Sequence, residues 1–300
     1  MAKKKNTDQQ LELFTPLLLG SMSVKDQQDL MQYPFFSLSK SKRVSPIEYD
    51  DGKVKITVTS PQEHGIASIF DADIIIYIAS LIRDHLNRGL PTSRKIKVSR
   101  YDVLQFIGKS TSGRGYKQLK SALDRLQATS ISTTITRENS RYKQYGRWGW
   151  LESYQIVEKE GKPIAIEITL SEWLYDGIVN DKLILTLNPK YFELDGGLEK
   201  YVYRLCRKVA GTNSQLQMKV GTVHKRSGVT QKPSRFLKMI EQIIEKQSIP
   251  DYWLFLAKRV STNDYYLCGL QKSRYKTREE AFMNISFVAM DRTALFHKPS

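Results

Sequence analysis

Basic and hydroxyl side chains gather around two turn glycines, Gly108 and Gly228, and continue at helical spacing through the residues that follow. Lysine and arginine pair with phosphate oxygens, and arginine, serine and glutamine also donate hydrogen bonds to base edges. Over residues 114–127 and 233–246, a wheel of about 100° per residue separates an apolar side from a side rich in these groups. The pattern indicates two helices that recognise a polyanion.

The candidate contacts fall into two groups. Side chains on the outer faces of the two helices are expected to reach base edges or nearby phosphates, and those at the turns and hairpin loops to position the DNA backbone. The expected reading residues are Arg114, Lys117, Ser121, Arg235 and Lys238, with Arg125 and Ser234 on the same faces. The expected backbone contacts are Lys109, Ser110, Arg141, Lys143, Arg147, Lys225, Thr230, Lys232, Lys258 and Arg259, and Arg226 at the second turn is a further expected DNA contact.

A charged helix face is more often only solvated than engaged in reading DNA. Three features favour DNA here, the third being the position of the acids given below. The cations concentrate at the two turns and helix starts, and they recur near the tips expected for two β-hairpins. The loop of the first hairpin is placed at residues 138–147, and the second hairpin turns at residues 261–263, just after Lys258 and Arg259. The acids of the second helix, Glu241 and Glu245, fall toward its far end.

A five-residue string near the N-terminus, Gln10-Leu11-Glu12-Leu13-Phe14, follows a polar, basic segment. It resembles the peptide that binds the bacterial sliding clamp, whose consensus is Gln-Leu-x-Leu-Phe. Leu13 and Phe14 are the expected apolar anchors, Gln10 fixes the orientation, and Leu11 fills the remaining specified position. The alternative is that this string packs on the domain as an ordinary apolar segment.

Signals for enzyme chemistry are weak. Residues 108–111 end like a phosphate-binding loop, but the glycine needed five residues earlier is Val103. The four histidines are dispersed, and two cysteines cannot form a four-ligand zinc cluster. Asp71 and Asp73 flank a helix start, where acids favour the helix dipole. We therefore expect no catalytic residues, cofactor or metal, although Tyr142 and Tyr145 leave a DNA-nicking tyrosine conceivable.

The elements around these candidates form a repeat. Each half is predicted to run helix, strand, helix, turn, helix and β-hairpin, which is the winged-helix plan. The two turn glycines are 120 residues apart, whereas pairs upstream, such as Lys97 with Lys219, are 122 apart; a two-residue deletion in the second middle helix reconciles them. The predicted elements are helices 71–87, 99–108, 114–127, 199–210, 221–228 and 233–246, and strands 54–59, 95–98, 130–137, 148–157, 163–170, 217–220, 253–260 and 265–271.

Composition supports a folded protein with an anionic partner. The chain has 300 residues, 40% of them hydrophobic, and 47 lysines and arginines against 31 aspartates and glutamates give a formal charge of +16. The longest apolar stretch, residues 72–82, is too short to span a bilayer and the N-terminus lacks the apolar core of a signal peptide, so we expect a cytoplasmic protein without membrane contact.

The expected fold class is α+β, with two tandem winged-helix domains and a flexible N-terminal tail. The tail carries the clamp-like peptide, and the remaining C-terminal stretch is assigned to neither core. The expected divisions are a tail over 1–32, a first domain over 33–187, a second over 188–275 and an extension over 276–300.

These features together resemble a bacterial plasmid replication initiator of the replication initiator protein A family. The sharpest pieces are Ser99–Leu126, Gly221–Ile244 and Gln10–Phe14. The resemblance implies binding to repeated origin sequences (iterons), local duplex opening, recruitment of the host helicase or initiator and of replisome proteins, and homodimers that repress the initiator's own gene. The alternatives are a winged-helix transcription regulator without replication activity and a DNA-processing enzyme such as a nickase or primase.

Overall fold

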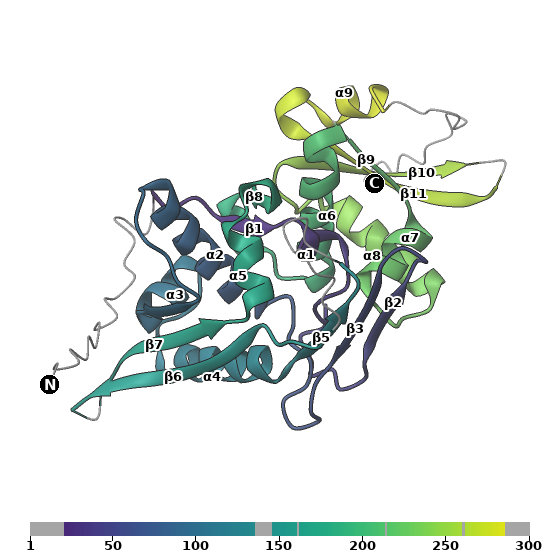
Figure 1. Ribbon diagram of the computed structural model, residues 1–300. Coiled ribbons are helices and arrows are strands. Elements are labelled where there is room, and N and C mark those ends of the chain that lie inside the picture. Colours follow the sequence, from purple (N-terminus) through teal and green to yellow (C-terminus); the bar gives the residue numbers. More distant parts are fainter. Residues whose placement is uncertain (1–20, 136–145, 161, 214, 260–261, 286–300) are drawn as a thin grey trace, which may run out of the picture.

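In the computed structural model, which describes residues 21–135, 146–160, 162–213, 215–259 and 262–285, helices and small antiparallel sheets build an α+β architecture (Figure 1). Two units with the same element order lie side by side. The first unit runs from α2 to β7, apart from β5, which belongs to another sheet, and the second runs from α6 to β11. Within the described residues, no helix combines the length and the apolarity needed to cross a bilayer.

The first unit places three helices against a three-stranded sheet. The strand order is β4-β7-β6, and Ile96 and Val98 of β4 face Ile168 and Ile166 of β7 in the register. Ser99 caps the second helix, since its side chain accepts a hydrogen bond from the backbone N–H of Asp102, as the sequence predicts. The elements are α2 (Ala72–Asn87), β4 (Lys95–Val98), α3 (Arg100–Phe106), α4 (Gly113–Ala128), β6 (Leu151–Lys159) and β7 (Lys162–Leu170).

The second unit repeats this arrangement. Its sheet has the order β10-β11-β9, so in both units the strand after the first helix pairs with the last strand of the hairpin. The first helix continues to Asn213 instead of ending at Gly211 as predicted. The elements are α6 (Gly197–Asn213), β9 (Gln215–Lys219), α7 (Val220–Ser227), α8 (Pro233–Lys246), β10 (Tyr252–Arg259) and β11 (Asp264–Gln271).

The two units keep one constant offset from the first strand to the second helix of the pair. Strand, short helix and long helix begin at residues 95, 100 and 113 in the first unit and at 215, 220 and 233 in the second. The predicted shift to an offset of 122 at this strand is therefore wrong, and no deletion in the middle helix is needed. The burial of side chains also agrees with an offset of 120 residues, because Ile96 and Leu216 then occupy equivalent buried positions.

A second sheet belongs to the first half of the chain. Its order is β2-β3-β5, and the predicted strand after α4 ends at Thr133, before Arg137. Short elements connect the units and close the fold. The elements outside the two units are β1 (Lys25–Gln27), α1 (Asp29–Gln32), β2 (Ile47–Asp50), β3 (Lys55–Thr59), β5 (Ser130–Thr133), α5 (Glu172–Val179), η2 (Asp181–Leu183), β8 (Ile184–Thr186), η3 (Pro189–Glu193), η4 (Lys272–Arg274) and α9 (Arg278–Met283).

The segment over residues 21–32 is part of the fold and not of a flexible tail. Strand β1 pairs antiparallel with β8, and Leu30 and Met31 of α1 are buried. Residues 276–285 of the C-terminal extension likewise belong to the fold, because α9 covers the second hairpin through Phe282 and Phe255. The predicted tail therefore overreaches by about a dozen residues.

One hydrophobic core runs through both units, so the predicted division near residues 187 and 188 does not separate two cores. Helix α6 also places two cations against acids of the first half. The Nζ of Lys200 lies 3.0 Å from the carboxylate of Asp73 on α2, and the Nε of Arg204 lies 2.8 Å from the carboxylate of Asp26 on β1. All four side chains are buried, so the ion pairs fix α6 to α2 and β1.

Candidate nucleic-acid interface

Helix α4 presents the first set of predicted reading residues. Leu119, Leu123 and Leu126 are buried against the core, whereas Arg114, Lys117, Gln118 and Ser121 are exposed. Its inner face is held further by Arg100 of α3, whose guanidinium lies 4.4 Å from the ring centre of Tyr116. The apolar period thus leaves the predicted reading stripe facing water.

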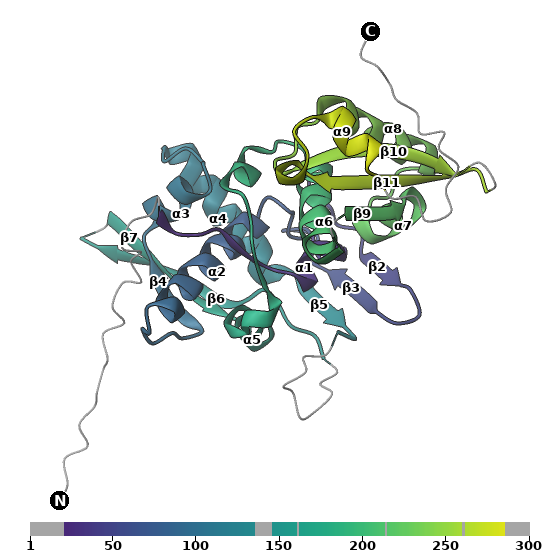
Figure 2. The same ribbon diagram turned by 90° about the horizontal axis from the view of Figure 1, so that it is seen from above.

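Helix α8 has the same construction. Phe236, Ile240, Ile243 and Ile244 are buried, and Phe236 stacks on His224 of α7 at 4.4 Å between ring centres. The exposed side chains are Ser234, Arg235, Lys238 and Gln242. Figure 2 shows α4 and α8 toward the same side of the molecule, opposite α5.

The two turns before these helices share one backbone conformation. Gly108 has φ +66° and Gly228 has φ +65°, the left-handed region that glycine enters at no steric cost. Lys109, Thr230 and Lys232 are exposed beside the turns. The hydroxyl of Ser110 is also exposed, but it already donates to Ser112 Oγ and accepts from the Ser112 N–H.

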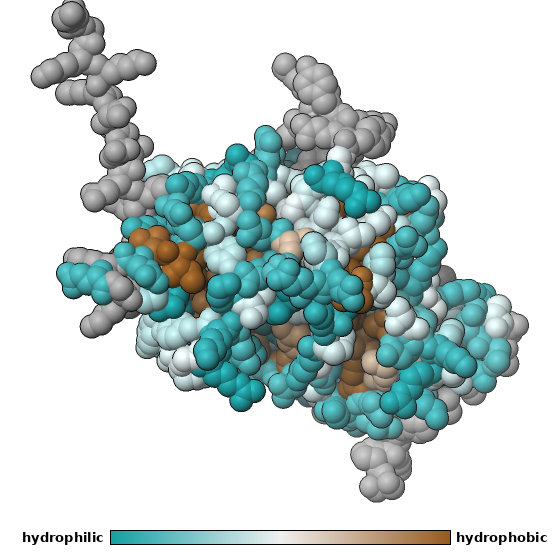
Figure 3. Space-filling model, turned by 90° about the horizontal axis from the view of Figure 1, so that it is seen from below, coloured by the Kyte–Doolittle hydropathy of each residue, from teal (hydrophilic) through white to brown (hydrophobic). Residues whose placement is uncertain are grey.

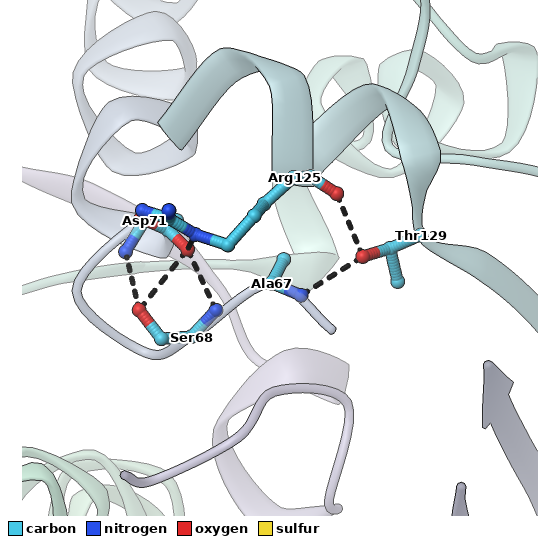
Figure 4. A network of polar contacts seen from close by, with 5 residues as sticks. All are labelled: Ala67, Ser68, Asp71, Arg125 and Thr129. Atoms are coloured by element: carbon cyan, nitrogen blue, oxygen red, sulfur yellow. Dashed lines mark hydrogen bonds and ion pairs between the residues drawn. The ribbon is translucent and has the colours of Figure 1, made fainter. Parts of the chain in front are cut away.

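Arg125 does not belong to the exposed face, contrary to the prediction. Its guanidinium donates from Nε and Nη2 to the two carboxylate oxygens of Asp71, at 2.8 and 2.7 Å (Figure 4). Asp71 also accepts from the N–H and hydroxyl of Ser68, and its side chain is only 4% exposed. Thr129 completes the network by donating to the Arg125 carbonyl and accepting from the Ala67 N–H. Arg125 therefore ties the end of α4 to the start of α2.

Arg226 and Lys225 also turn toward the first half of the chain. The Arg226 guanidinium lies 5.4 Å from the ring centre of Tyr33, and Lys225 Nζ lies 5.7 Å from that of Tyr49. Burial and a hydrogen bond to Asp51 raise the pKa of Tyr49 to about 12, so its hydroxyl stays protonated. Arg226 is half-buried and packs against Tyr33 and Tyr49 of the first half, which corrects its prediction as a DNA contact, whereas Lys225 keeps an exposed side chain.

The first hairpin lies elsewhere than predicted. Strands β6 and β7 form it, with its turn after Lys159. The loop after β5 leads into β6 and is closed only by an isolated antiparallel bridge between Ile131 and Trp148. Arg147, at the end of that loop, donates to Thr59 Oγ1 of β3. Arg141 and Lys143 lie outside the described residues. Their predicted contact with the DNA backbone therefore stays a prediction.

The second hairpin carries its two cations where they were predicted. Lys258 and Arg259 end β10, and Arg259 faces Asp264 across the hairpin. Lys258 Nζ lies 5.5 Å from the ring centre of Tyr265, and both cations are half-buried by such neighbours. The clamp-like residues Gln10, Leu11, Leu13 and Phe14 lie outside the described residues.

One basic segment was missed. Residues 39–43 have the sequence Ser-Lys-Ser-Lys-Arg, a local charge cluster that is visible in the sequence but is not among the predicted contacts. In the structure it forms an exposed loop next to α4 and α8. Seen from below, the molecule presents a mostly hydrophilic face, on which hydrophobic residues show only in separate patches (Figure 3).

Other chemistries leave few traces in the part of the chain that is described. No group of three or more histidine, cysteine, aspartate or glutamate side chains there is placed to hold a metal ion. Cys206 and Cys268 are free and buried, and burial raises the pKa of the Cys268 thiol to about 12. Their thiols are therefore protonated and shielded at neutral pH.

Comparisons with known proteins indicate one family by sequence and a shared fold by structure. The family model described as replication initiator protein A matches residues 25–254. A putative replication protein of Wigglesworthia glossinidia brevipalpis is 32% identical over 227 residues, which cover 74% of this chain and 81% of the relative. Two crystal structures of domains 2 and 3 of RctB, one of them a selenomethionine derivative, share the fold at 13% identity. Their TM-scores are 0.58 and 0.53, and they cover 80% and 81% of this chain and 97% and 96% of their own.

Proposed function

Because the chain belongs to the replication initiator protein A family, we propose that it binds repeated origin sequences in double-stranded DNA through two winged-helix units and thereby starts replication. The observation that carries the proposal is the repeated unit itself. Each unit has the order helix, strand, helix, helix, hairpin and the same strand order, with an exposed basic stripe on the second helix of the pair. In winged-helix proteins this helix enters the major groove.

Both reading helices serve one site in this proposal. Consecutive major-groove contacts on one face of DNA are about 34 Å apart, and the shared core and buried ion pairs hold α4 and α8 at a fixed spacing. Arg114, Lys117, Ser121, Arg235 and Lys238 are the proposed base-edge residues. Lys109, Thr230 and Lys232 position the backbone at the turns.

Duplex opening and recruitment follow from binding and not from catalysis. The phosphate-binding glycine is missing, so the energy for local opening comes from binding and DNA deformation. The clamp-like peptide and the host helicase or initiator connect the bound origin to the replisome. Incubation of the protein with supercoiled DNA and Mg²⁺ or Mn²⁺ should leave the DNA intact. A nicked product would contradict a non-enzymatic role.

The DNA-binding proposal is tested by footprinting on DNA adjacent to the protein's own gene. We expect protection of repeats of about two helical turns. Arg235→Ala should cost about 1–3 kcal/mol in binding and relax preference at one base position. The matched control is Lys276→Ala, which removes an exposed cation near α9. Equal weakening on every sequence would assign Arg235 to the phosphates, and absence of any protected site would refute the proposal.

The clamp proposal is tested by pull-down with the purified sliding clamp. Leu13→Ala and Phe14→Ala should each abolish capture, because they remove the apolar anchors. Glu12→Ala changes the unspecified position of the motif and is the control that should still bind. If the clamp still captures both the Leu13→Ala and the Phe14→Ala variant, this peptide does not bind the clamp.

A further inference from the structure

The loop over Ser39–Arg43 is held at both ends. On one side, Ser37 donates its N–H to the Ala67 carbonyl and accepts from the Ile69 N–H. On the other side, the Arg43 carbonyl accepts from the Ile66 N–H at 2.8 Å. The Arg43 guanidinium donates to the Gly228 carbonyl at 2.6 Å, so the loop is attached to the turn before α8. These contacts give an exposed loop a fixed position.

This loop separates two hollows that lie next to the two turns. Lys40 lines a cavity of about 290 Å³ together with Lys109 of the first turn and Gln118 of α4. On its other side, Lys42 lines a groove of about 640 Å³ together with Thr230 of the second turn and Gln242 of α8. The loop is therefore placed between the turn of one helix pair and the turn of the other.

The surroundings of the loop are positive. Each hollow is lined by three basic side chains and one acid, and both acids are already bonded within the protein. Asp71 is paired with Arg125, and Glu199 accepts from the Gly196 N–H and from Ser248 Oγ. The ammonium groups of Lys40 and Lys42 have no carboxylate partner among the described residues. Lys42 Nζ donates one hydrogen bond to the exposed Glu63 carbonyl at 3.2 Å and Lys40 Nζ lies 5.6 Å from the Phe70 ring centre, and an ammonium group has three donors, so both can still bind a phosphate. Serine hydroxyls of the loop add donors suited to phosphate oxygens.

We infer that Lys40 and Lys42 contact the phosphates between the two major-groove contacts, where the DNA backbone passes from one helix pair to the other. This inference rests on the proposed function. Two reading helices one turn apart leave a stretch of backbone facing the protein between them, and a fixed basic loop at that point neutralises it without reading sequence. Arg43 is a positioning residue, because its guanidinium is committed to backbone carbonyls.

The test is the salt dependence of binding to a duplex that holds one full repeat. Each neutralised phosphate contributes a slope of about −0.9 in log K against log salt, so Lys40→Ala with Lys42→Ala should reduce the slope by about 1.8. Preference among sequences should stay unchanged. Lys276→Ala is the control and should keep the wild-type slope. An unchanged slope in the double variant, with a normal unfolding transition, would overturn the inference.

A second measurement locates the contact. Methylphosphonates, which lack the charge, replace the phosphates in the middle of the repeat; they should weaken the wild type but cause little further loss in the double variant. Methylphosphonates at the ends should weaken both proteins equally. If the central substitution weakens both proteins equally, the loop does not lie there. If the wild type binds no repeat at all, the result refutes the proposed function itself, which is a different outcome from a wrong placement of the loop.

Discussion

The buried pair of Asp73 and Lys200 offers the most direct test of how the two units are joined. Opposite charges 3.0 Å apart attract by about 5 kcal/mol at an effective dielectric constant of about 20, and both side chains are fully buried. Removal of one partner leaves the other charge desolvated, so Lys200→Met should lower the free energy of unfolding by about 3–5 kcal/mol. Asp73→Leu should have a similar effect.

The double variant distinguishes a charge effect from a packing effect. Apolar side chains of similar volume often replace a buried ion pair without loss, so Asp73→Leu with Lys200→Met should be within about 1 kcal/mol of the wild type or more stable. Urea unfolding followed by circular dichroism gives all four free energies of the cycle. A double variant as unstable as the single ones, or a Lys200→Met change below about 1 kcal/mol, would refute the reasoning.

The pH dependence of the pair has a definite sign. Burial raises the pKa of Asp73 to about 6, against the opposing attraction of Lys200. The folded protein thus binds this proton more tightly than the unfolded chain, and the corresponding stability is lost as the pH rises from about 4 to 6. The stability of the wild type relative to the double variant should fall over this window. A rise over the same window would contradict the assignment.

Two other sets of substitutions test the glycine turns and the role of Arg125. Gly228→Ala should lower the free energy of unfolding more than Gly108→Ala, because both positions have positive φ but only at Gly228 would a Cβ lie 2.8 Å from Pro34 Cβ; the space at Gly108 is open. Equal midpoints of unfolding in urea would contradict this. Arg125→Ala should lower the free energy of unfolding by about 2–3 kcal/mol, because Asp71 loses its bidentate partner. It should leave the salt dependence of DNA binding unchanged. A weaker salt dependence at unchanged stability would show that Arg125 contacts DNA.

Local signals in the sequence predicted the repeated elements well. The Ser99 cap, the left-handed glycines at 108 and 228 and the apolar periods of the two long helices act over a few residues. These features depend on residues close by in the sequence, so they can be predicted from it. The predicted bounds of α8 therefore agree with the observed ones. The exposed stripes followed directly from the same periods.

Features that depend on distant partners could not be predicted. Strand β1 has three residues and no period to detect, and it pairs with β8 about 160 residues away. Arg125 and Asp71 are 54 residues apart, so an arginine on an amphipathic helix looked the same whether it faced water or an acid. The choice of β6 over β5 as the first strand of the hairpin likewise depends on pairing, since both segments alternate as strands do.

The two buried ion pairs of α6 restrict which second half could be joined to the first half of this chain. Lys200 and Arg204 belong to the second half, but their counterions come from α2 and β1 in the first. A graft that brought in a second half from a relative with other residues at these places would leave two uncompensated charges in the interior. Under the proposed function, a change of DNA preference in this chain is therefore expected from point substitution on the exposed stripes and not from exchange of one half.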